Sequence, residues 1–128
     1  MVDDAAFARA WVSSRHHGRG LGRRALGNEL RRRGVAAETV GEALAELDPE
    51  TEAETARELV RRRLRSVNAP PETVVRRMVG MLARRGYPPG LAFRVVKDVL
   101  AEDERTASLA DELDPDALAS AADDTGLT

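Results

Sequence analysis

The stretch LGNELRRRG at residues 26–34 recurs as MVGMLARRG at residues 78–86, 52 residues further along the chain. Both copies begin with an apolar residue, have a leucine four positions later, continue with arginines and end in glycine. Apolar residues spaced by four lie on one face of a helix, and glycine commonly ends a helix because it adopts positive φ. The recurrence therefore predicts two copies of one helical unit.

The same shift of 52 residues aligns positions well outside this stretch. Phe7 falls on Leu59, and Arg24 falls on Arg76. Apolar periodicity predicts six helices, and no segment sustains the period of two that a strand requires. The expected helices cover residues 3–15, 21–33, 37–47 and 49 to about 67, with a fifth that ends at Gly86 and a sixth that opens at Pro88-Pro89.

These helices predict an all-α fold of tandem three-helix repeats that form a short curved helical array. We expect units at residues 1–48 and 49–102, followed by an acidic, mobile tail at residues 103–128. Trp11 is interpreted as a core residue, with an anchor for a partner as the alternative. The residues expected to hold the units are Phe7, Trp11, Leu26, Leu30, Gly34, Leu59, Leu82 and Gly86.

The composition excludes several classes of protein. The chain of 128 residues has no cysteine, which excludes disulfides and thiolate sites, and its aromatic fraction of 3% is low for a β-sandwich. No apolar run reaches the length of a membrane-spanning helix, and no phosphate-binding loop occurs. His16 and His17 are adjacent, without metal-binding spacing, and Gly18, Gly20 and Gly22 are expected in a flexible loop. We expect no enzyme activity, no cofactor and no metal.

The charges are divided unevenly along the chain. Residues 1–102 hold 19 basic and 14 acidic residues, whereas residues 103–128 hold one basic and eight acidic residues. Lys97 is the only lysine, so 19 of the 20 basic residues are arginines. Their guanidinium groups suit phosphate or carboxylate partners because they donate paired hydrogen bonds. These arginines predict a basic contact surface for a phosphate backbone or an acidic protein filament, with a solvated helix face as the alternative. The candidates are Arg15, Arg19, Arg23, Arg24, Arg31, Arg32, Arg76, Arg77, Arg84 and Arg85.

Several motifs together resemble the RecX family of regulatory proteins. The first copy carries DDxxFAxxWVxxR at residues 3–15, GLG at residues 20–22 and LxxELxxxGV at residues 26–35. The second copy continues the resemblance with AxxLVxxxL at residues 56–64, LxxxG at residues 82–86 and AxxVV at residues 92–96. The resemblance covers about residues 2–102. Members of the family usually contain an earlier three-helix unit, which this chain is expected to lack.

The resemblance implies a regulator without catalytic activity. Such a protein binds along the groove of a RecA-like recombinase filament and inhibits its ATPase, strand exchange and coprotease activity in DNA repair, homologous recombination and the SOS response. We expect a cytoplasmic monomer that does not interact with membranes, and direct contact with single- or double-stranded DNA stays open. The alternative is an independent nucleic-acid-binding helical module, whose affinity for naked nucleic acid falls steeply with salt.

Overall fold

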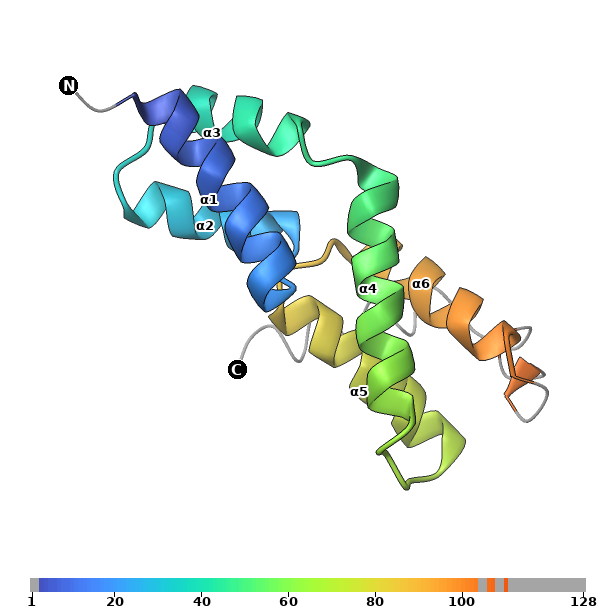
Figure 1. The fold of residues 1–128 in the computed structure, drawn as a ribbon. Helices are drawn as coiled ribbons and strands as arrows, with labels where there is room; N and C mark the ends of the chain where they lie inside the picture. Colours follow the sequence, from blue (N-terminus) through green and yellow to red (C-terminus); the bar gives the residue numbers. More distant parts are fainter. Residues whose placement is uncertain (1–2, 104–105, 108–109, 111–128) are drawn as a thin grey trace.

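The computed structural model describes residues 3–103, 106–107 and 110 of the chain. Within these residues it contains six helices and no strand (Figure 1). The all-α repeat fold predicted from the sequence is confirmed. The predicted mobile tail lies almost entirely outside the described residues. The helices are α1 (Asp4–Arg19), α2 (Arg23–Arg32), α3 (Ala37–Ala45), α4 (Pro49–Leu64), α5 (Pro71–Arg84) and α6 (Pro89–Ala101).

The six helices form two groups, each around its own apolar core. α1, α2 and α3 enclose one core, in which Leu26 and Leu30 are fully buried, and we call this group the first unit. α4, α5 and α6 enclose the other, in which Met78 and Leu82 are fully buried, and we call this group the second unit. In Figure 1, α1 runs from the outer end of the first unit toward the second unit.

Two helices begin at aspartate side chains that cap them. Asp3 Oδ1 accepts hydrogen bonds from the backbone N–H groups of Ala5 and Ala6, at 3.1 and 3.2 Å. Asp48 Oδ2 accepts from Thr51 N–H at 3.2 Å, and Pro49 is the first residue of α4. Carboxylates at these positions satisfy N–H groups that have no partner inside the helix, and proline fits the first helical position because it lacks that N–H.

The end of α1 differs from the prediction. The sequence predicts that the first helix ends at residue 15, and this prediction is wrong, because α1 continues through Gly18 to Arg19. Gly20 ends the helix in the left-handed conformation, with φ of 67° and its N–H bonded to the carbonyl of His16. The helix therefore stops at the glycine that can adopt positive φ, one full turn later than expected.

His16 explains why the helix continues. Its ring is fully buried, and its Nδ1 donates a 2.8 Å hydrogen bond to the carbonyl of Leu21. Nε2 lies 2.9 Å from Thr55 Oγ1 on α4. A buried imidazole whose two nitrogens both have partners fixes the last turns of α1 against the second unit.

The glycine loop between α1 and α2 packs closely on the second unit. Gly22 N–H donates to the carbonyl of Arg85 at 2.7 Å, and Arg24 N–H donates to the carbonyl of Gly86 at 2.9 Å. A Cβ on Gly22 would lie 2.7 Å from the backbone of Gly86, and one on Gly86 would overlap Ala25. The prediction of a flexible loop is therefore wrong. We call the contact of residues 19–25 with Glu52, Thr55, Leu59 and residues 85–87 the joint.

The second unit also caps α2. Gly22, the N-cap of α2, has no side chain to accept a hydrogen bond, and Glu52 supplies the missing acceptor. Glu52 Oε2 accepts from Arg23 N–H and Oε1 accepts from Arg23 Nε, both at 2.8 Å. Arg23 Nη2 donates in turn to the carbonyl of Leu47 at 2.8 Å. The Glu52 side chain is only 1% exposed, so this is a buried charge held by its partner.

Tyr87 completes the joint from the turn between α5 and α6. Its ring is 1% exposed, and its hydroxyl donates a 2.9 Å hydrogen bond to the carbonyl of Gly20. Arg85 Nη1 donates to the carbonyl of Arg19 at 2.8 Å. The carbonyls of Arg19 and Gly20, at the end of α1, thus both accept hydrogen bonds from the second unit. The last carbonyls of a helix have no partner inside it, so a buried helix end requires such donors.

Titration of Tyr87 gives a pH-dependent test of the joint. Burial, and to a smaller extent the negative charge of Glu52, raises the pKa of the Tyr87 hydroxyl above its ordinary value. The folded state therefore holds this proton more tightly than the unfolded state. The associated stability is fully present below about pH 10, the ordinary tyrosine pKa, and is lost as the pH rises beyond it.

We expect the phenolate absorbance of the chain to appear only at pH values where the protein also unfolds. Tyr87 is the only tyrosine, so the ultraviolet titration reports this residue alone. The variant Tyr87→Phe should lose about 1 kcal/mol of stability at neutral pH because the hydrogen bond to Gly20 is gone. A phenol that titrates at its ordinary pKa in the folded chain would contradict the buried joint.

Candidate partner-binding surface

Three arginines of α5 lie on one exposed side of that helix. Arg76, Arg77 and Arg84 line an open hollow of about 330 Å³ together with Thr73 and Gly80. The three side chains are exposed, and among the described residues none of them has an ion-pair partner. Unpaired guanidinium groups along one helix face can each bind an anionic oxygen, so this hollow suits a row of phosphates or carboxylates.

Arg24 lies across the joint, with its backbone near the end of α5. Because Arg24 N–H bonds to the carbonyl of Gly86, the first turn of α2 lies against the end of α5, two residues beyond Arg84. Its side chain is exposed and has no partner among the described residues. We call the five residues Arg24, Thr73, Arg76, Arg77 and Arg84 the basic row.

The remaining arginines predicted on α2 lie at its other end. Arg31 and Arg32 are in the last turn of α2 and are exposed. Arg31 Nη2 donates to Asn28 Oδ1 at 2.8 Å, which leaves most of its donors free. α2 is about 15 Å long at 1.5 Å per residue, so these two side chains begin roughly one helix length from Arg24.

Three of the predicted contact residues make contacts within the chain. The guanidinium of Arg23 pairs with the buried Glu52. Arg85 is partly buried and bonds to the carbonyl of Arg19, so it belongs to the joint. Arg19 itself is exposed. Arg15 lies over the ring of Trp11, 4.3 Å from its centroid.

Trp11 is at the margin of the first core. It is partly buried, and its indole lies between the guanidinium groups of Arg15 and Arg33, at 4.3 and 4.1 Å. Its Nε1 donates to Glu29 Oε1 at 2.9 Å. Cations above an aromatic ring are attracted to its electron-rich face, so the arginines hold the indole in one orientation. The ring is therefore neither fully in the core nor free.

Phe7 corrects a sequence prediction. It is expected to hold the first unit, yet it is 36% exposed and is the large apolar side chain most accessible among the described residues. Its ring centroid lies 5.7 Å from that of Trp11 on the same helix. Its counterpart in the repeat, Leu59, is partly buried against the second core and reaches the joint. The 52-residue shift therefore aligns the two positions but not their exposure.

Two of the four arginines of α4, Arg57 and Arg61, are neutralised by carboxylates. Arg57 binds Glu50 and Glu54 at 2.9 and 2.7 Å, and Arg61 binds Glu58 and Glu102 at 2.7 Å each. Hydrogen bonds from these arginines lower the pKa of Glu54 below its ordinary value. Exposed pairs of this kind contribute little stability, but they remove Arg57 and Arg61 from the set of free cations.

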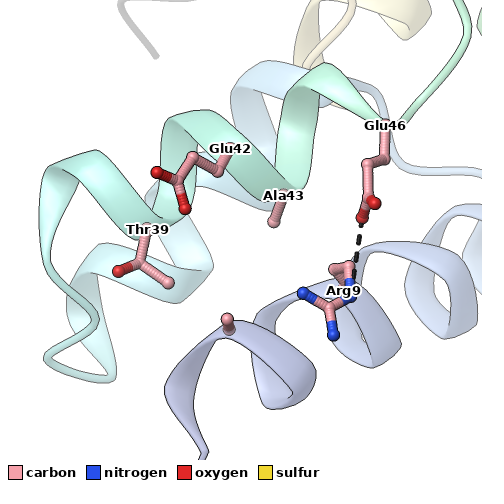
Figure 2. A pocket seen from close by; sticks show the side chains of 6 residues that line it. Arg9, Thr39, Glu42, Ala43 and Glu46 are labelled. Atoms are coloured by element: carbon pink, nitrogen blue, oxygen red, sulfur yellow. Dashed lines mark ion pairs between the residues drawn. The ribbon is translucent and has the colours of Figure 1, made fainter.

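A second hollow, between α1 and α3, has a mixed charge. Figure 2 shows Glu46, the C-cap residue of α3, pointing across to Arg9 of α1, and the carboxylate lies 3.6 Å from Arg9 Nε. The hollow has a volume of about 190 Å³ and is also lined by Glu42 and Thr39. Arg9 and Glu46 are 49% and 62% exposed, so water screens both charges. General acid or base catalysis is favoured by a carboxyl group shielded from water, and the Glu46 side chain is exposed.

Neither metal binding nor membrane insertion is supported in the part of the chain that the structure describes. No group of three or more histidine, aspartate or glutamate side chains there could hold a metal ion. No helix in residues 3–103 is long and apolar enough to cross a bilayer. Among the described residues, the basic row is thus the strongest feature for binding a ligand.

Sequence reasoning missed Thr73 and the contacts of Glu52 and Thr55 in the joint. Thr73 could have been found from its spacing, because it lies three residues before Arg76 on the same helix face. The sequence does not indicate that Glu52 pairs with Arg23. A glutamate in the first turn of a helix is already favoured by the helix dipole, so its presence there needs no partner to explain it.

Two domain models of one family match the chain. Residues 3–44 match the model described as "RecX, second three-helix domain", and residues 50–96 match "RecX, third three-helix domain". The matched segments coincide closely with the helices of the first and second units. No solved structure matches the chain.

Three curated relatives, each named "Regulatory protein RecX", illustrate the similarity. The chain is 53% identical over 114 residues to the protein of Streptomyces coelicolor, 59% over 101 residues to that of Thermobifida fusca and 48% over 108 residues to that of Mycolicibacterium smegmatis. These alignments cover 88%, 78% and 80% of this chain, and 61%, 55% and 57% of the respective relative. The chain thus spans less than two thirds of the length of these relatives.

Proposed function

The chain belongs to the RecX family of regulatory proteins, and we propose that it binds the RecA recombinase filament and lowers the filament's ATPase, strand-exchange and coprotease activities. In this proposal the chain regulates DNA repair, homologous recombination and the SOS response without catalysing a reaction. It acts as a cytoplasmic monomer. The units at residues 1–48 and 49–102 form one binding array, and residues 103–128 are an appended acidic tail.

The observation that carries the binding proposal is the basic row. Arg24, Arg76, Arg77 and Arg84 are exposed without acidic partners among the described residues, and they come from both units. A filament of protein on DNA presents carboxylates and phosphates at regular intervals, so a row of guanidinium groups across two units can contact several of them at once. The joint supports this by holding α2 and α5 in a fixed relation.

The rigid joint also favours a regulator over a flexible tether. A surface that is assembled before binding loses little conformational entropy when it binds, and this leaves more of the contact energy for affinity. The Arg23–Glu52 pair and the Tyr87 hydrogen bond both cross from one unit to the other. The two halves of the basic row therefore approach a partner as one surface.

The double variant Arg24→Glu with Arg76→Glu tests this assignment. We expect it to abolish inhibition of RecA ATPase on single-stranded DNA, because it reverses the charge in both halves of the row, while helicity measured by circular dichroism is unchanged. The matched control is Arg94→Glu with Lys97→Glu, which makes the same change of charge at exposed positions of α6. Full inhibition by the Arg24/Arg76 variant, or equal loss in the control, would contradict the assignment.

An independent nucleic-acid-binding module is the second candidate, favoured by the same hollow of Thr73 and three arginines on α5. Its signature is binding to naked single- or double-stranded DNA that weakens steeply with salt. Each phosphate contact adds about 0.7 to 0.9 to the slope of log affinity against log salt. Inhibition of RecA at concentrations where naked DNA stays unbound would favour the filament, and binding to DNA without any effect on RecA would favour the module.

A further inference from the structure

The C-terminal part of the chain carries a run of negative charge. The acidic tail continues beyond Ala110, the last residue that the structure describes, as residues 111–128. These residues contain six carboxylate side chains and no arginine, lysine or histidine, and we call them the acidic segment. The carboxylates belong to Asp111, Glu112, Asp114, Asp116, Asp123 and Asp124.

The basic row carries the opposite charge on the same molecule. Arg76, Arg77 and Arg84 line one hollow of about 330 Å³, are exposed and have no ion-pair partner among the described residues. Where carboxylates are within reach, arginines of this chain bind them, since Arg57 and Arg61 each hold two at 2.7 to 2.9 Å. The row is therefore a cationic surface with unused capacity for carboxylates.

The acidic segment is attached to the unit that carries most of the row. Ala110 is 2% exposed and packs in the core of the second unit. The 18 residues that follow it can span up to about 60 Å when extended. α5 has 14 residues and is about 21 Å long. The segment is thus long enough to bring carboxylates to all three arginines of α5 from any point on the second unit.

Attachment to the same chain favours this segment over other occupants of the row. A tethered group has an effective concentration of about a millimolar, well above that of a second copy of the chain in dilute solution. Residues 1–102 hold 19 basic and 14 acidic residues, and the tail brings the net charge of the whole chain to -2. A polyanionic partner is therefore attracted by the row and repelled by the tail, and it competes with the tail for the same arginines.

We propose that the acidic segment binds the basic row of its own chain through contacts between carboxylates and guanidinium groups, and that an anionic partner displaces it. The proposal rests on the proposed function in that the basic row is the surface that receives the partner, and it adds a regulation of that surface. The apparent affinity for the partner falls in proportion to the fraction of molecules whose row is free. Neutralising the segment frees the row without altering it.

A spin label on the acidic segment measures the contact directly in the full chain. The sequence has no cysteine, so Ser120→Cys provides a single labelling site between the two groups of carboxylates. At about 10 mM salt the nitroxide should broaden the backbone amide signals of the three α5 arginines, and at about 1 M salt, where the Debye length is only about 3 Å, the broadening should disappear. The amides of Glu38 and Glu42 on α3 are the reference and should stay sharp in both.

A polyanion should release the segment from the row. Inorganic tripolyphosphate binds guanidinium groups, so it should sharpen the three amide signals more than sodium chloride of equal ionic strength does. A labelled variant whose six carboxylates are replaced by amides, called the neutral variant, should show no broadening. Its substitutions are Asp111→Asn, Glu112→Gln, Asp114→Asn, Asp116→Asn, Asp123→Asn and Asp124→Asn.

Competition also predicts tighter binding of tripolyphosphate to the unlabelled neutral variant. If the segment occupies the row in about nine tenths of the molecules, the gain in affinity is about tenfold. A pair of variants that each lose three negative charges controls for net charge. One is Asp114→Asn with Asp116→Asn and Asp123→Asn, and the other is Asp4→Asn with Glu38→Gln and Glu42→Gln, at exposed positions of the first unit. The first should tighten binding more than the second.

Three results would overturn the proposal. The first is that the three arginine amides stay sharp at low salt in the labelled chain. The second is broadening that appears equally on α3, persists in the neutral variant or resists tripolyphosphate. The third is equal affinity of the original chain and the neutral variant for tripolyphosphate. The label on the unaltered carboxylates decides the question even where a variant does not fold.

RecA ATPase separates this proposal from the proposed function. We expect the neutral variant to inhibit RecA at lower concentration than the original chain. Release of the segment by tripolyphosphate, together with no inhibition of RecA by either chain, would support the contact and contradict the proposed function. Inhibition of RecA by both chains at the same concentration, with sharp arginine amides in the labelled chain, would do the reverse.

Discussion

Replacing Gly86 by alanine should destabilise the chain by about 3 kcal/mol, of which about 1 to 2 kcal/mol arises from the positive φ and the rest from overpacking. The φ of Gly86 is 91°, a region that a residue with a Cβ rarely adopts. The added methyl group would also overlap the backbone and Cβ of Ala25 in α2. Relief of this overlap requires α2 to move away, which breaks the 2.9 Å bond from Arg24 N–H to the carbonyl of Gly86.

The control for this prediction is Gly34→Ala. Gly34 occupies the corresponding place in the first unit, with φ of 86°, but a Cβ there would meet nothing within 4 Å among the described residues. The two variants therefore share the backbone strain and differ only in the contact. Gly34→Ala should cost about 1 to 2 kcal/mol. Urea unfolding followed by circular dichroism measures both, and an equal loss at the two positions would contradict the close packing of the joint.

The sequence predicted the helices well because they depend on local periodicity. Leu26, Leu30 and Leu82 are spaced so that they share a helix face, and all three are fully buried. Asp3 and Asp48 cap their helices from adjacent positions in the chain. Signals that act within one or two helical turns can be read without knowledge of the fold.

The joint could not be predicted because its partners are far apart in the sequence. The hydroxyl of Tyr87 bonds to Gly20, 67 residues away, and the imidazole of His16 approaches Thr55, 39 residues away. A glycine-rich loop predicts flexibility by composition, but here the missing side chains of Gly22 and Gly86 permit close approach of two backbones. Composition alone does not distinguish these two uses of glycine.

The sequence predicts only part of the candidate site, because the partners of its arginines are also far apart in the sequence. A count of arginines does not reveal which of them have acidic partners. Arg76, Arg77 and Arg84 face the solvent as a row, whereas Arg23 turns inward to Glu52, 29 residues further on. Arg23 and Arg24 are neighbours of the same type, and only the position of the second unit separates their roles.

Because Arg23 pairs with Glu52 and Arg24 does not, the variant Arg23→Ala should strongly lower the stability of the chain. Glu52 is 1% exposed and would lose the Arg23 Nε that lies 2.8 Å from its Oε1, keeping only the backbone N–H of residue 23. A buried carboxylate without its countercharge typically costs about 3 to 5 kcal/mol, and we expect the lower end because the Arg23 side chain is itself 28% exposed. Urea unfolding measures this loss.

Arg24→Ala is the matched control, since it removes the adjacent arginine, which is exposed and has no partner among the described residues. It should change stability by less than about 0.5 kcal/mol while weakening inhibition of RecA.

Glu52→Gln combined with Arg23→Ala should recover part of the loss, because the neutral amide still accepts from the backbone N–H and needs no countercharge. If Arg23→Ala proved as mild as Arg24→Ala, the buried pair would not be what fixes α2 to the second unit. If the double variant recovered nothing, the loss would come from packing of the Arg23 side chain and not from an unpaired charge.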